Sequence, residues 1–520
     1  MIRYIFTLFF LIIILQFNIS AQTPTWSEDI AEIIYQNCST CHRSGNIAPF
    51  ILESYAAAVS NISGIAYEVN NGTMPPWLAD PTYVRHANER ILTPDQITKI
   101  NDWIAASMPI GDIAVAPPFP SFTDGSTLSG VDLSLKIPDY TSTAITDDEY
   151  RCFVIPSGVT VDKFINEMEI LPGNRDIVHH VLIFTDTTGE AATLDAVSPG
   201  AGYPCFGDDG TSNPYMIGAW VPGGDNMVLP DGFGIRLAAN SDIILQIHYP
   251  AGSSGILDSS RINMKFDDAT TSREVYSQFV LNHFFTISEP LIIPANTEKD
   301  FTSEYEIPNL FPGFAITLFA VGPHMHLVGE SIKTYAINTS GDTIPLNNIP
   351  DWDFHWQGTY YYPNPKIIMG GSTLKAEAHY NNTITNTNLT APPSLVVLGE
   401  STSDEMFLVN MLFSIYNTGD EDIVMDSIIP DIGVGISAPI YSDLSIYPNP
   451  SANAIYINLP DQFSLYVFTI YDMQGKIVYT NNHINTNTGY VPLPELSNGL
   501  YTIALRNDKK ILQNKLIVAK

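Results

Sequence analysis

Short segments in which apolar residues alternate with polar ones, or follow one another without a break, recur through the chain after residue 130. They are separated by turn residues and lie at 151–156, 177–184, 243–249, 315–327 and 373–380. A period of two residues is typical of β-strands. Charged residues make up only 15% of the sequence, while Thr, Ser, Asn, Tyr and Ile are abundant, which favours strands and turns over long helices. We therefore expect most of the chain to be β-structure.

The length of 520 residues exceeds what one hydrophobic core usually organises, so several folding units are expected. Residues 113–130, which include several Pro, Gly and Ser, show no hydrophobic period and predict a linker. After it we predict two antiparallel β-sandwiches of the jelly-roll type, at 131–275 and 276–425. The last segment, 442–520, is expected to form a further small unit.

The charge balance excludes one class of partner. The chain has 23 Lys and Arg against 55 Asp and Glu, which gives a net charge of -32. Binding of a polyphosphate backbone draws on clustered basic side chains, so no nucleic acid is expected as a partner.

The first residues, 1–21, have the pattern of a signal peptide for export. Arg3 supplies a positive charge, residues 4–15 are apolar, and Ala21 is a small residue before Gln22. A signal anchor is the alternative, but about 20 apolar residues are needed to span a bilayer and this run is shorter. We expect a mature protein that works outside the cytoplasm, where disulfides persist.

Two of the four cysteines stand in the segment Cys38-Ser39-Thr40-Cys41-His42. This spacing is the attachment signature of c-type haem, in which each thiol binds a vinyl group and His42 becomes the proximal iron ligand. A zinc site is the alternative, but it needs a second pair of ligands at short range, and none is near. We predict covalently bound haem c.

The surrounding residues predict a small helical domain at 25–112. Residues 26–34 have the pattern of a capped amphipathic helix, and a second capped helix starts at Thr93 with Pro94 in its first turn. Between them, Met74 precedes two prolines that stiffen a loop, and it is the expected axial ligand of the iron. In the alternative interpretation Met74 fills the core. Residues 25–112 resemble a class I cytochrome c, which implies a small all-α domain.

Histidines on the strand-like segments form a second pattern. His324 and His326 alternate, so in a strand both side chains point to the same face while Met325 points to the other. His179 and His180 are adjacent and would diverge in a regular strand, so they can share one ion only at a strand end or a bulge. Imidazoles with one thioether suit copper, which cycles between two oxidation states. For any one of these histidines the alternative is a structural polar side chain on a sheet face.

Five segments carry a family resemblance: Asp176-Ile177-Val178-His179-His180, Ala219-Trp220-Val221-Pro222-Gly223-Gly224, Leu245-Gln246-Ile247-His248-Tyr249, Gly322-Pro323-His324-Met325-His326 and Asp404-Glu405-Met406. Through them, residues from about 130 to 425 resemble the copper type II, ascorbate-dependent monooxygenases, the family of peptidylglycine α-hydroxylating monooxygenase and dopamine β-monooxygenase. The resemblance implies two similar antiparallel β-sandwiches with one copper ion each, and ascorbate as a reductant. The electron-donating copper would be held by His179, His180 and His248. The copper that binds oxygen and substrate would be held by His324, His326 and Met406.

The ligand sets fit this chemistry. A thioether favours Cu(I), and a shell of three ligands leaves positions open for dioxygen, whereas a three-histidine site suits storage and transfer of an electron. One departure concerns the substrate. Where peptide-acting members carry an Arg, an Asn and a Tyr that bind a substrate carboxylate, this chain has Gly322, Leu408 and Asn410. We therefore expect a substrate without that carboxylate.

The haem segment is a second departure from that family, and it leads to the hypothesis that haem supplies electrons to copper in place of free ascorbate.

Cys152 and Cys205 are the remaining cysteines, and we predict that they pair because the compartment is oxidising. Met411 is the nearby alternative to Met406 as the thioether ligand, but the residues before Met406 match the family pattern. The other histidines belong to no motif and are interpreted as structural: His86, His283, His355, His379 and His483.

The final segment contains three further motifs: Leu444-Ser445-Ile446-Tyr447-Pro448-Asn449-Pro450, Phe468-Thr469-Ile470-Tyr471-Asp472-Met473-Gln474-Gly475-Lys476 and Leu496-Ser497-Asn498-Gly499-Leu500-Tyr501-Thr502. Gly475 and Gly499 stand where tight hairpin turns need a positive φ. The segment resembles the C-terminal sorting domain of the type IX secretion system, which implies a small immunoglobulin-like β-sandwich at 442–520 that the export machinery recognises. The protein would pass through the periplasm to the cell surface or the medium. An ordinary accessory β-domain is the alternative.

Two hypotheses for the function follow. The first is a secreted, haem-fused copper monooxygenase that hydroxylates a C–H bond of a small organic substrate with O2 and an electron donor. The second is a non-catalytic protein that binds copper or transfers electrons through haem and copper. Met406 favours the first hypothesis, because an electron carrier has no need of an open, oxygen-binding copper position.

Overall fold

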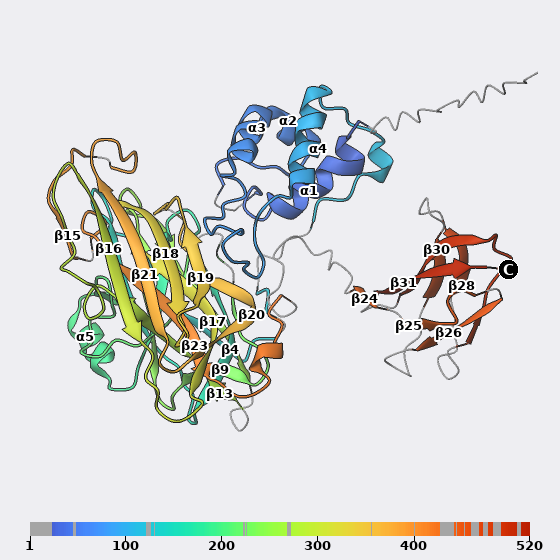
Figure 1. Cartoon of the computed structure of the whole chain (residues 1–520). Helices are drawn as coiled ribbons and strands as arrows, with labels where there is room; N and C mark the ends of the chain where they lie inside the picture. Colours follow the sequence, from blue (N-terminus) through green and yellow to red (C-terminus); the bar gives the residue numbers. More distant parts are fainter. Residues whose placement is uncertain are drawn as a thin grey trace, which may run out of the picture. The chain divides into compact units, whose positions relative to one another are not determined.

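A computed structural model describes residues 23–519 of the chain, apart from 45–47, 121–125, 129, 222–223, 225, 268–271, 355, 390, 400, 427–440, 444, 452, 459–466, 472–476, 482–489 and 507–510. The predicted signal peptide, His355, His483, Gly475 and two residues of the Ala219–Gly224 motif lie outside the described residues. The chain divides between residues 434 and 435 into two compact units. Each unit is described by itself (Figure 1).

The first part of the larger unit is helical. Its elements are η1 Trp26–Ile30, α1 Ala31–Asn37, α2 Tyr55–Ser60, α3 Ile62–Asn71, α4 Pro94–Ala105 and the short η2 Ile113–Val115. The start of α4 carries a complete capping box, because the Gln96 amide N–H donates to the Thr93 hydroxyl and the Thr93 N–H donates to the Gln96 side chain. The apolar faces of η1, α1 and α4 meet around Trp26, Ile34 and Trp103.

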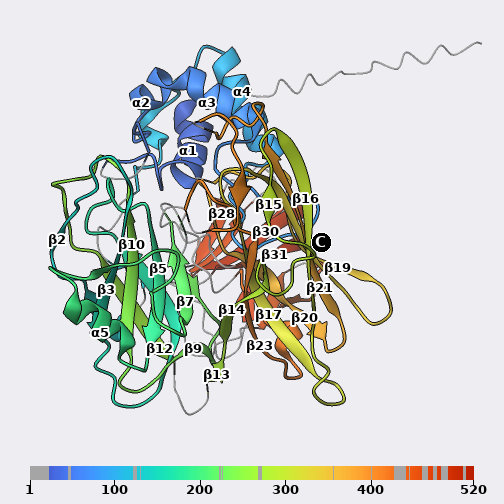
Figure 2. The ribbon, with the colours of Figure 1, turned by 90° about the vertical axis from the view of Figure 1, so that its left-hand side faces the viewer.

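Two sheets follow in the same unit. One has the order β1-β12-β4-β9-β13, with β8 beside β4, and the other has the order β6-β3-β10-β5-β7. The strands are β1 Leu133–Lys136, β3 Glu149–Pro156, β4 Lys163–Leu171, β5 His180–Asp186, β6 Tyr203–Pro204, β7 Met216–Trp220, β8 Met227–Val228, β9 Phe233–Leu237, β10 Asp242–Tyr249, β12 Arg261–Asp267 and β13 Arg273–Glu274. Figure 2 shows β3, β10, β5 and β7 as neighbouring strands. The short pair β2 Tyr140–Thr141 and β11 Leu257–Asp258 and the helix α5 Glu190–Val197 complete this part.

The alternation of β10 decides what faces the core. Ile243, Leu245 and Ile247 belong to the large apolar cluster that residues of both sheets share. Ile244, between them, belongs to a smaller cluster with Cys152. The period of two therefore turns His248 away from the large cluster, as expected for a strand.

A further pair of sheets has the orders β14-β23-β17-β20 and β16-β21-β18-β19. Their strands are β14 Tyr276–Asn282, β16 Thr297–Glu306, β17 Ala315–His324, β18 Gly329–Ile337, β19 Thr343–Ile349, β20 Tyr360–Met369, β21 Thr373–Asn382 and β23 Leu408–Ile415, with the short pair β15 Ile292–Ile293 and β22 Val396–Val397 and the helix η3 Asp420–Asp422. Leu318, Ile332 and Leu374 are buried in the cluster between these sheets.

The predicted fold class is wrong. We expected a separate all-α cytochrome c domain, followed by two separate antiparallel β-sandwich domains and an immunoglobulin-like sandwich. The structure is mostly β, and its few helices belong to the same compact unit as the sheets. The sheets are also not purely antiparallel, since β13 pairs with β9, and β24 with β31, in parallel.

The physical reason lies in the segment between α3 and α4. Residues 77–90 of this segment do not close a core of their own but pack on the β-sheets. Ala79 and Val84 are buried in the cluster of the second pair of sheets. The Ala87 N–H donates to the Tyr361 carbonyl over 2.8 Å, and the Asp80 N–H donates to the Asn348 carbonyl over 2.8 Å. The helical segment is thereby joined to the sheets.

The smaller unit contains two sheets, β24-β31-β30-β27-β28 and β25-β26-β29. The strands are β24 Tyr441–Asp443, β25 Ser445–Tyr447, β26 Ala454–Asn458, β27 Val467–Tyr471, β28 Ile477–Asn481, β29 Tyr490–Pro492, β30 Gly499–Arg506 and β31 Ile511–Val518. Ile455, Phe468 and Ile503 are fully buried in its own core. Within the described part of the chain, no helix has the length and apolar character needed to cross a membrane.

Candidate metal centres

The first candidate centre is formed by His179, His180 and His248. Strand β5 begins at His180, which lies directly opposite His248 on β10, and His179 precedes the strand. The His179 N–H still donates to the His248 carbonyl over 3.0 Å. The His180 Nδ1 atom lies 3.3 Å from the Nδ1 atoms of both His179 and His248. The strand end that adjacent histidines require is therefore present, and it brings the three rings together.

This geometry fits a single ion. Two nitrogen ligands about 2.0 Å from an ion at the tetrahedral angle lie about 3.3 Å apart, which is the separation found here. The second nitrogen of His248 is engaged, since its Nε2 lies 3.1 Å from Asp148 Oδ2. Tyr150 stacks on the same ring, with centroids 4.4 Å apart. Such a partner orients the imidazole and leaves Nδ1 for the metal.

Burial makes these rings good ligands. It lowers the pKa of His248 to about 4, with a further contribution from His179. The pKa of His180 is also well below its usual value, first through burial and then through the neighbouring histidines, which include His324 and His326. At neutral pH the rings of His180 and His248 are therefore uncharged, which is the form that binds metal.

The second candidate centre contains His324, His326 and Met406. Strand β17 ends at His324, and His326 follows in the next turn, with the two ring centroids 5.0 Å apart. Met325 is fully buried in the core behind them. His324 Nδ1 lies 2.5 Å from Gln357 Oε1, and His326 Nδ1 lies 3.2 Å from the Asp404 carbonyl. Both rings therefore have Nε2 left for a metal.

A buried carboxylate joins the Met406 segment to the histidine pair. The Glu405 side chain accepts hydrogen bonds from the backbone N–H groups of His326, Val328 and Met406. Burial raises the pKa of this carboxyl to about 8, against the effect of the hydrogen bonds. Tyr380 donates its hydroxyl to the Met406 carbonyl over 2.8 Å. Met406 is thus held in place beside His326 although 80 residues separate them, as counted from the sequence.

Both centres line one cavity of about 740 Å³. His179, His180, His324, His326 and Met406 are all on its wall. The wall also includes the three positions that differ from the peptide-acting pattern, namely Gly322, Leu408 and Asn410. Met411 is fully buried in the sheet core and is not among the lining residues, so the structure places Met406, and not Met411, at the cavity.

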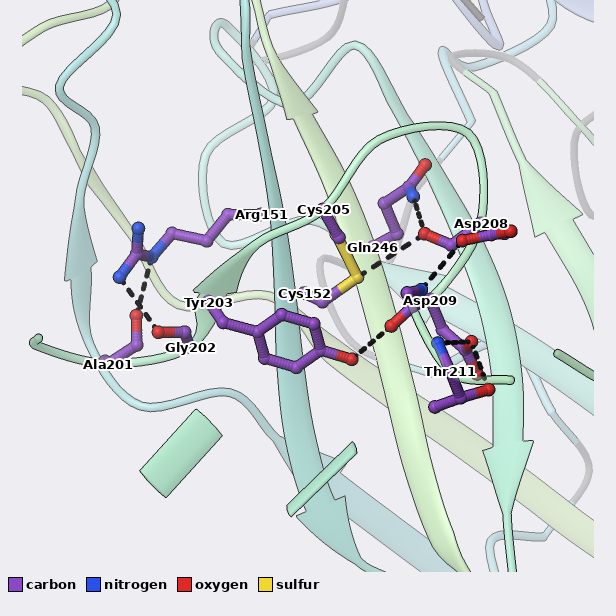
Figure 3. The surroundings of a disulfide bond; sticks show 11 residues. Arg151, Cys152, Ala201, Gly202, Tyr203, Cys205, Asp208, Asp209, Thr211 and Gln246 are labelled. Atoms are coloured by element: carbon purple, nitrogen blue, oxygen red, sulfur yellow. Dashed lines mark hydrogen bonds between the residues drawn. A yellow bond between two sulfur atoms is a disulfide. The ribbon is translucent and has the colours of Figure 1, made fainter. Parts of the chain in front are cut away.

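The predicted disulfide is confirmed. Cys152 on β3 is bonded to Cys205, and the loop that follows is tied down by further hydrogen bonds (Figure 3). Tyr203 donates its hydroxyl to the Asp209 carbonyl, and Gln246 Nε2 donates to the Asp208 carbonyl over 2.5 Å. Asp208 lines the cavity, so these bonds fix part of its wall.

The Cys38-Ser39-Thr40-Cys41-His42 segment follows α1. His42 Nδ1 lies 3.0 Å from the Phe50 carbonyl, which leaves Nε2 for iron. Burial raises the pKa of Cys38 to about 12. Met74 follows α3 with 40% of its surface exposed. Its pairing with His42 on one haem stays a prediction.

Three residues around the centres had no signal of their own in the sequence: Asp148, Tyr150 and Gln357. Glu405 stood in the Asp404-Glu405-Met406 motif, but its hydrogen bond to the His326 N–H was not predicted. Of the histidines interpreted as structural, His283 accepts the Phe407 N–H over 3.0 Å and also lines the cavity. His379 forms ion pairs with Asp300 and Glu330.

Comparisons with known proteins find similarity in two parts of the chain. Residues 280–424 match the family model "Copper type II ascorbate-dependent monooxygenase, C-terminal domain", and residues 445–519 match "Secretion system C-terminal sorting domain". The chain is 26% identical over 250 residues to DBH-like monooxygenase protein 2 of Mus musculus, which covers 45% of this chain and 39% of that protein. It is 24% identical over 277 residues to DBH-like monooxygenase protein 1 of Gallus gallus, which covers 50% of this chain and 44% of that protein. A tyramine beta-hydroxylase of Caenorhabditis briggsae is 23% identical over 41% of this chain and 37% of its own length. The chain thus spans less than half the length of these relatives.

Proposed function

We propose that this chain is a copper type II ascorbate-dependent monooxygenase, an oxidoreductase that hydroxylates a C–H bond of a small organic molecule with O2; the match of residues 280–424 to that family's C-terminal domain and the similarity to DBH-like monooxygenases support this. His179, His180 and His248 would hold one copper ion, and His324, His326 and Met406 a second. Copper, when bound, supplies one-electron chemistry and a place for dioxygen. One oxygen atom would enter the substrate and the other would leave as water, with two electrons from a donor such as ascorbate and two protons.

The single observation that supports this proposal is that one cavity is lined by five of the six predicted ligands, His179, His180, His324, His326 and Met406, while His248 lies behind them against His180. A carrier that only passes electrons needs no enclosed space beside a centre completed by a thioether. The chain's own residues do the remaining work. Asp148, Gln357 and the Asp404 carbonyl set the orientation of the imidazoles, and the mostly apolar wall offers a surface for an apolar substrate.

We include haem c in the proposal as a one-electron donor. The Phe50 carbonyl holds His42 in the form that presents Nε2, and Cys38 and Cys41 are not in a disulfide. Cys38, Cys41, His42 and Met74 would hold the group. An absorption spectrum of the purified protein, with Cys38→Ala as the control that removes one thioether, tests this part separately.

We also propose the route and destination of the protein. The sorting domain at 445–519 indicates export by a secretion system. We assign this to type IX secretion across the outer membrane, with delivery to the cell surface or the medium. Deletion of the sorting domain should leave the protein inside the cell envelope.

The test of the activity compares two methionines. Copper-loaded protein is incubated with ascorbate, isotopically labelled dioxygen and a panel of small aromatic and aliphatic compounds, and products are analysed by mass spectrometry. We expect the unmodified protein and Met411→Ile, whose thioether lies in the core, to insert one labelled oxygen atom. Met406→Ile should keep the three-histidine copper and lose the product. Absence of labelled product from every compound while copper still cycles would favour the electron-transfer alternative.

A further inference from the structure

His283 directly follows strand β14 and lines the cavity between the candidate copper ligands. Only 4% of its surface is exposed. Its Nδ1 atom accepts the backbone N–H of Phe407 over 3.0 Å. Phe407 is the residue after Met406, so this hydrogen bond places His283 beside the second candidate centre.

The hydrogen bond to Phe407 also fixes where the proton of the ring is. A backbone N–H can only donate, so the Nδ1 atom that accepts it carries no proton, and the proton of the neutral ring is on Nε2. His324 and His326 are in the opposite form, because their Nδ1 atoms donate to oxygen atoms of Gln357 and Asp404. Those two rings therefore offer a lone pair to a metal, whereas His283 offers an N–H donor.

This donor has no acceptor within the part of the chain that the structure describes. Two other buried polar atoms of the cavity wall, Trp77 Nε1 and the Tyr360 hydroxyl, also have no partner among the described residues. An indole nitrogen can only donate, and a tyrosine hydroxyl can donate as well. Buried N–H and O–H groups normally have an acceptor. The wall thus has donors without acceptors, and a bound molecule can supply the missing acceptor.

The turn that carries His283 is held by its own hydrogen bonds. Asn282 Oδ1 accepts the N–H groups of Phe284 and Phe285 over 3.0 and 2.9 Å, and the Thr286 hydroxyl donates to the Asn282 carbonyl over 2.9 Å. The ring of Phe284 meets that of His283 edge to face, with centroids 4.3 Å apart. Phe284 and Phe285 are 62% and 90% exposed and also line the cavity, so they lie at its mouth. They offer aromatic surface to the apolar part of a ligand.

We propose that His283 determines substrate specificity by donating its Nε2–H to an uncharged acceptor, such as a ketone oxygen, on an aromatic or apolar molecule. This inference rests on the proposed function and adds the substrate class. A carboxylate would lose much of its hydration beside a mostly apolar wall, and an ammonium group has no acceptor for an N–H donor. The class agrees with the expectation, based on Gly322, Leu408 and Asn410, of a substrate without a carboxylate.

NMR of copper-free protein with isotopically labelled histidine tests the inference without any turnover. The His283 signals are assigned with the His283→Asn variant, and they should show the proton on Nε2. The probes are acetophenone, isopropenylbenzene, in which a CH2 group replaces the ketone oxygen, benzoate and protonated 1-phenylethylamine. Acetophenone should move the Nε2–H proton signal downfield and bind about fivefold or more tightly than isopropenylbenzene. Equal binding of these two, tightest binding of benzoate or the amine, or a proton on Nδ1 would overturn the inference.

Two variants separate the donor from the bond to Phe407. His283→Asn keeps an oxygen acceptor near the place of Nδ1 and removes the Nε2–H group, so the preference for acetophenone should vanish at an unchanged melting temperature. His283→Gln puts an amide N–H near the place of Nε2 and should keep a reduced preference. The matched control is His379→Asn, the same change at a histidine that does not line the cavity, which should keep the full preference. An unchanged preference in His283→Asn would contradict the proposed role.

If His283→Asn also weakened the binding of isopropenylbenzene, the unmodified protein would decide, because its Nε2–H signal must respond to acetophenone for the inference to stand. These measurements need neither copper nor dioxygen, so their failure is distinct from failure of the monooxygenase activity. A full preference for the ketone without any labelled product would contradict the proposed function alone.

Discussion

The two candidate copper centres are built in different ways. In the first, His180 and His248 are direct partners on neighbouring strands and their Nδ1 atoms lie 3.3 Å apart, with Asp148 and Tyr150 orienting the His248 ring. In the second, the ligands come from the end of β17 and from a loop 80 residues later, and side-chain hydrogen bonds hold them, leaving Nε2 for the metal. A centre built on the strand ladder is rigid, whereas one that depends on a few polar contacts can be adjusted by changing those contacts.

The largest expected effect is that a single substitution in either centre removes the copper ion of that centre only. His180→Ala should remove the first copper and leave the second, and His326→Ala should do the reverse, because the two ligand sets share no residue. Metal analysis of the purified variants should give one copper per chain in each case, against two in the unmodified protein. His379→Ala, at an ion-paired histidine outside both centres, is the control. Loss of both ions from either single variant would contradict the separation of the centres.

The next effect concerns the network that holds the second centre. Glu405→Ala leaves three buried backbone N–H groups without an acceptor, so the free energy of unfolding should fall by about 4 kcal/mol. Glu405→Gln keeps a carbonyl oxygen and should lose less than half of that. Urea denaturation measures both values, and metal analysis should show that the alanine variant loses the second copper but keeps the first. A variant as stable as the unmodified protein would show that the carboxylate does not hold the loop.

A smaller expected effect is the contribution of His86 to the pH dependence of the free energy of unfolding. Burial lowers the pKa of His86, behind the second centre, to about 4. Between this value and about 6.5 the unfolded chain binds a proton that the folded protein does not, so the free energy of unfolding falls as the pH decreases, by up to about 3 kcal/mol from this residue. His86→Phe removes this contribution, so its melting temperature should change less with pH between 6.5 and 4.

Other buried histidines contribute to the same pH range, so the relevant quantity is the difference between variant and unmodified protein. An identical slope for His86→Phe and the unmodified protein would place His86 in contact with solvent and would weaken the docking of residues 77–90.

Much of the fold and of the candidate centres could be predicted from local sequence patterns. The capping box at Thr93, the strand period of 243–249 and the pairing of Cys152 with Cys205 follow from residue types at short spacing, or from the few cysteines present. The adjacency of His179 and His180 indicated a strand end or a bulge, and strand β5 begins at His180. The prediction of an independent helical domain was wrong, because the apolar residues at 77–84 fit a helical core and a sheet surface equally well.

The amino-acid sequence by itself identified the candidate donor residues, the Cys-x-x-Cys-His segment and the sorting domain, since each depends on residue types within a few neighbouring positions. Only the tertiary structure decided that Glu405 would hold Met406 beside His326, that Gln357 would orient His324, and that His283, bonded to Phe407, would line their cavity. These contacts join residues tens to hundreds of positions apart. Their formation depends on strand register and on the packing of distant apolar faces, which no short stretch of sequence contains.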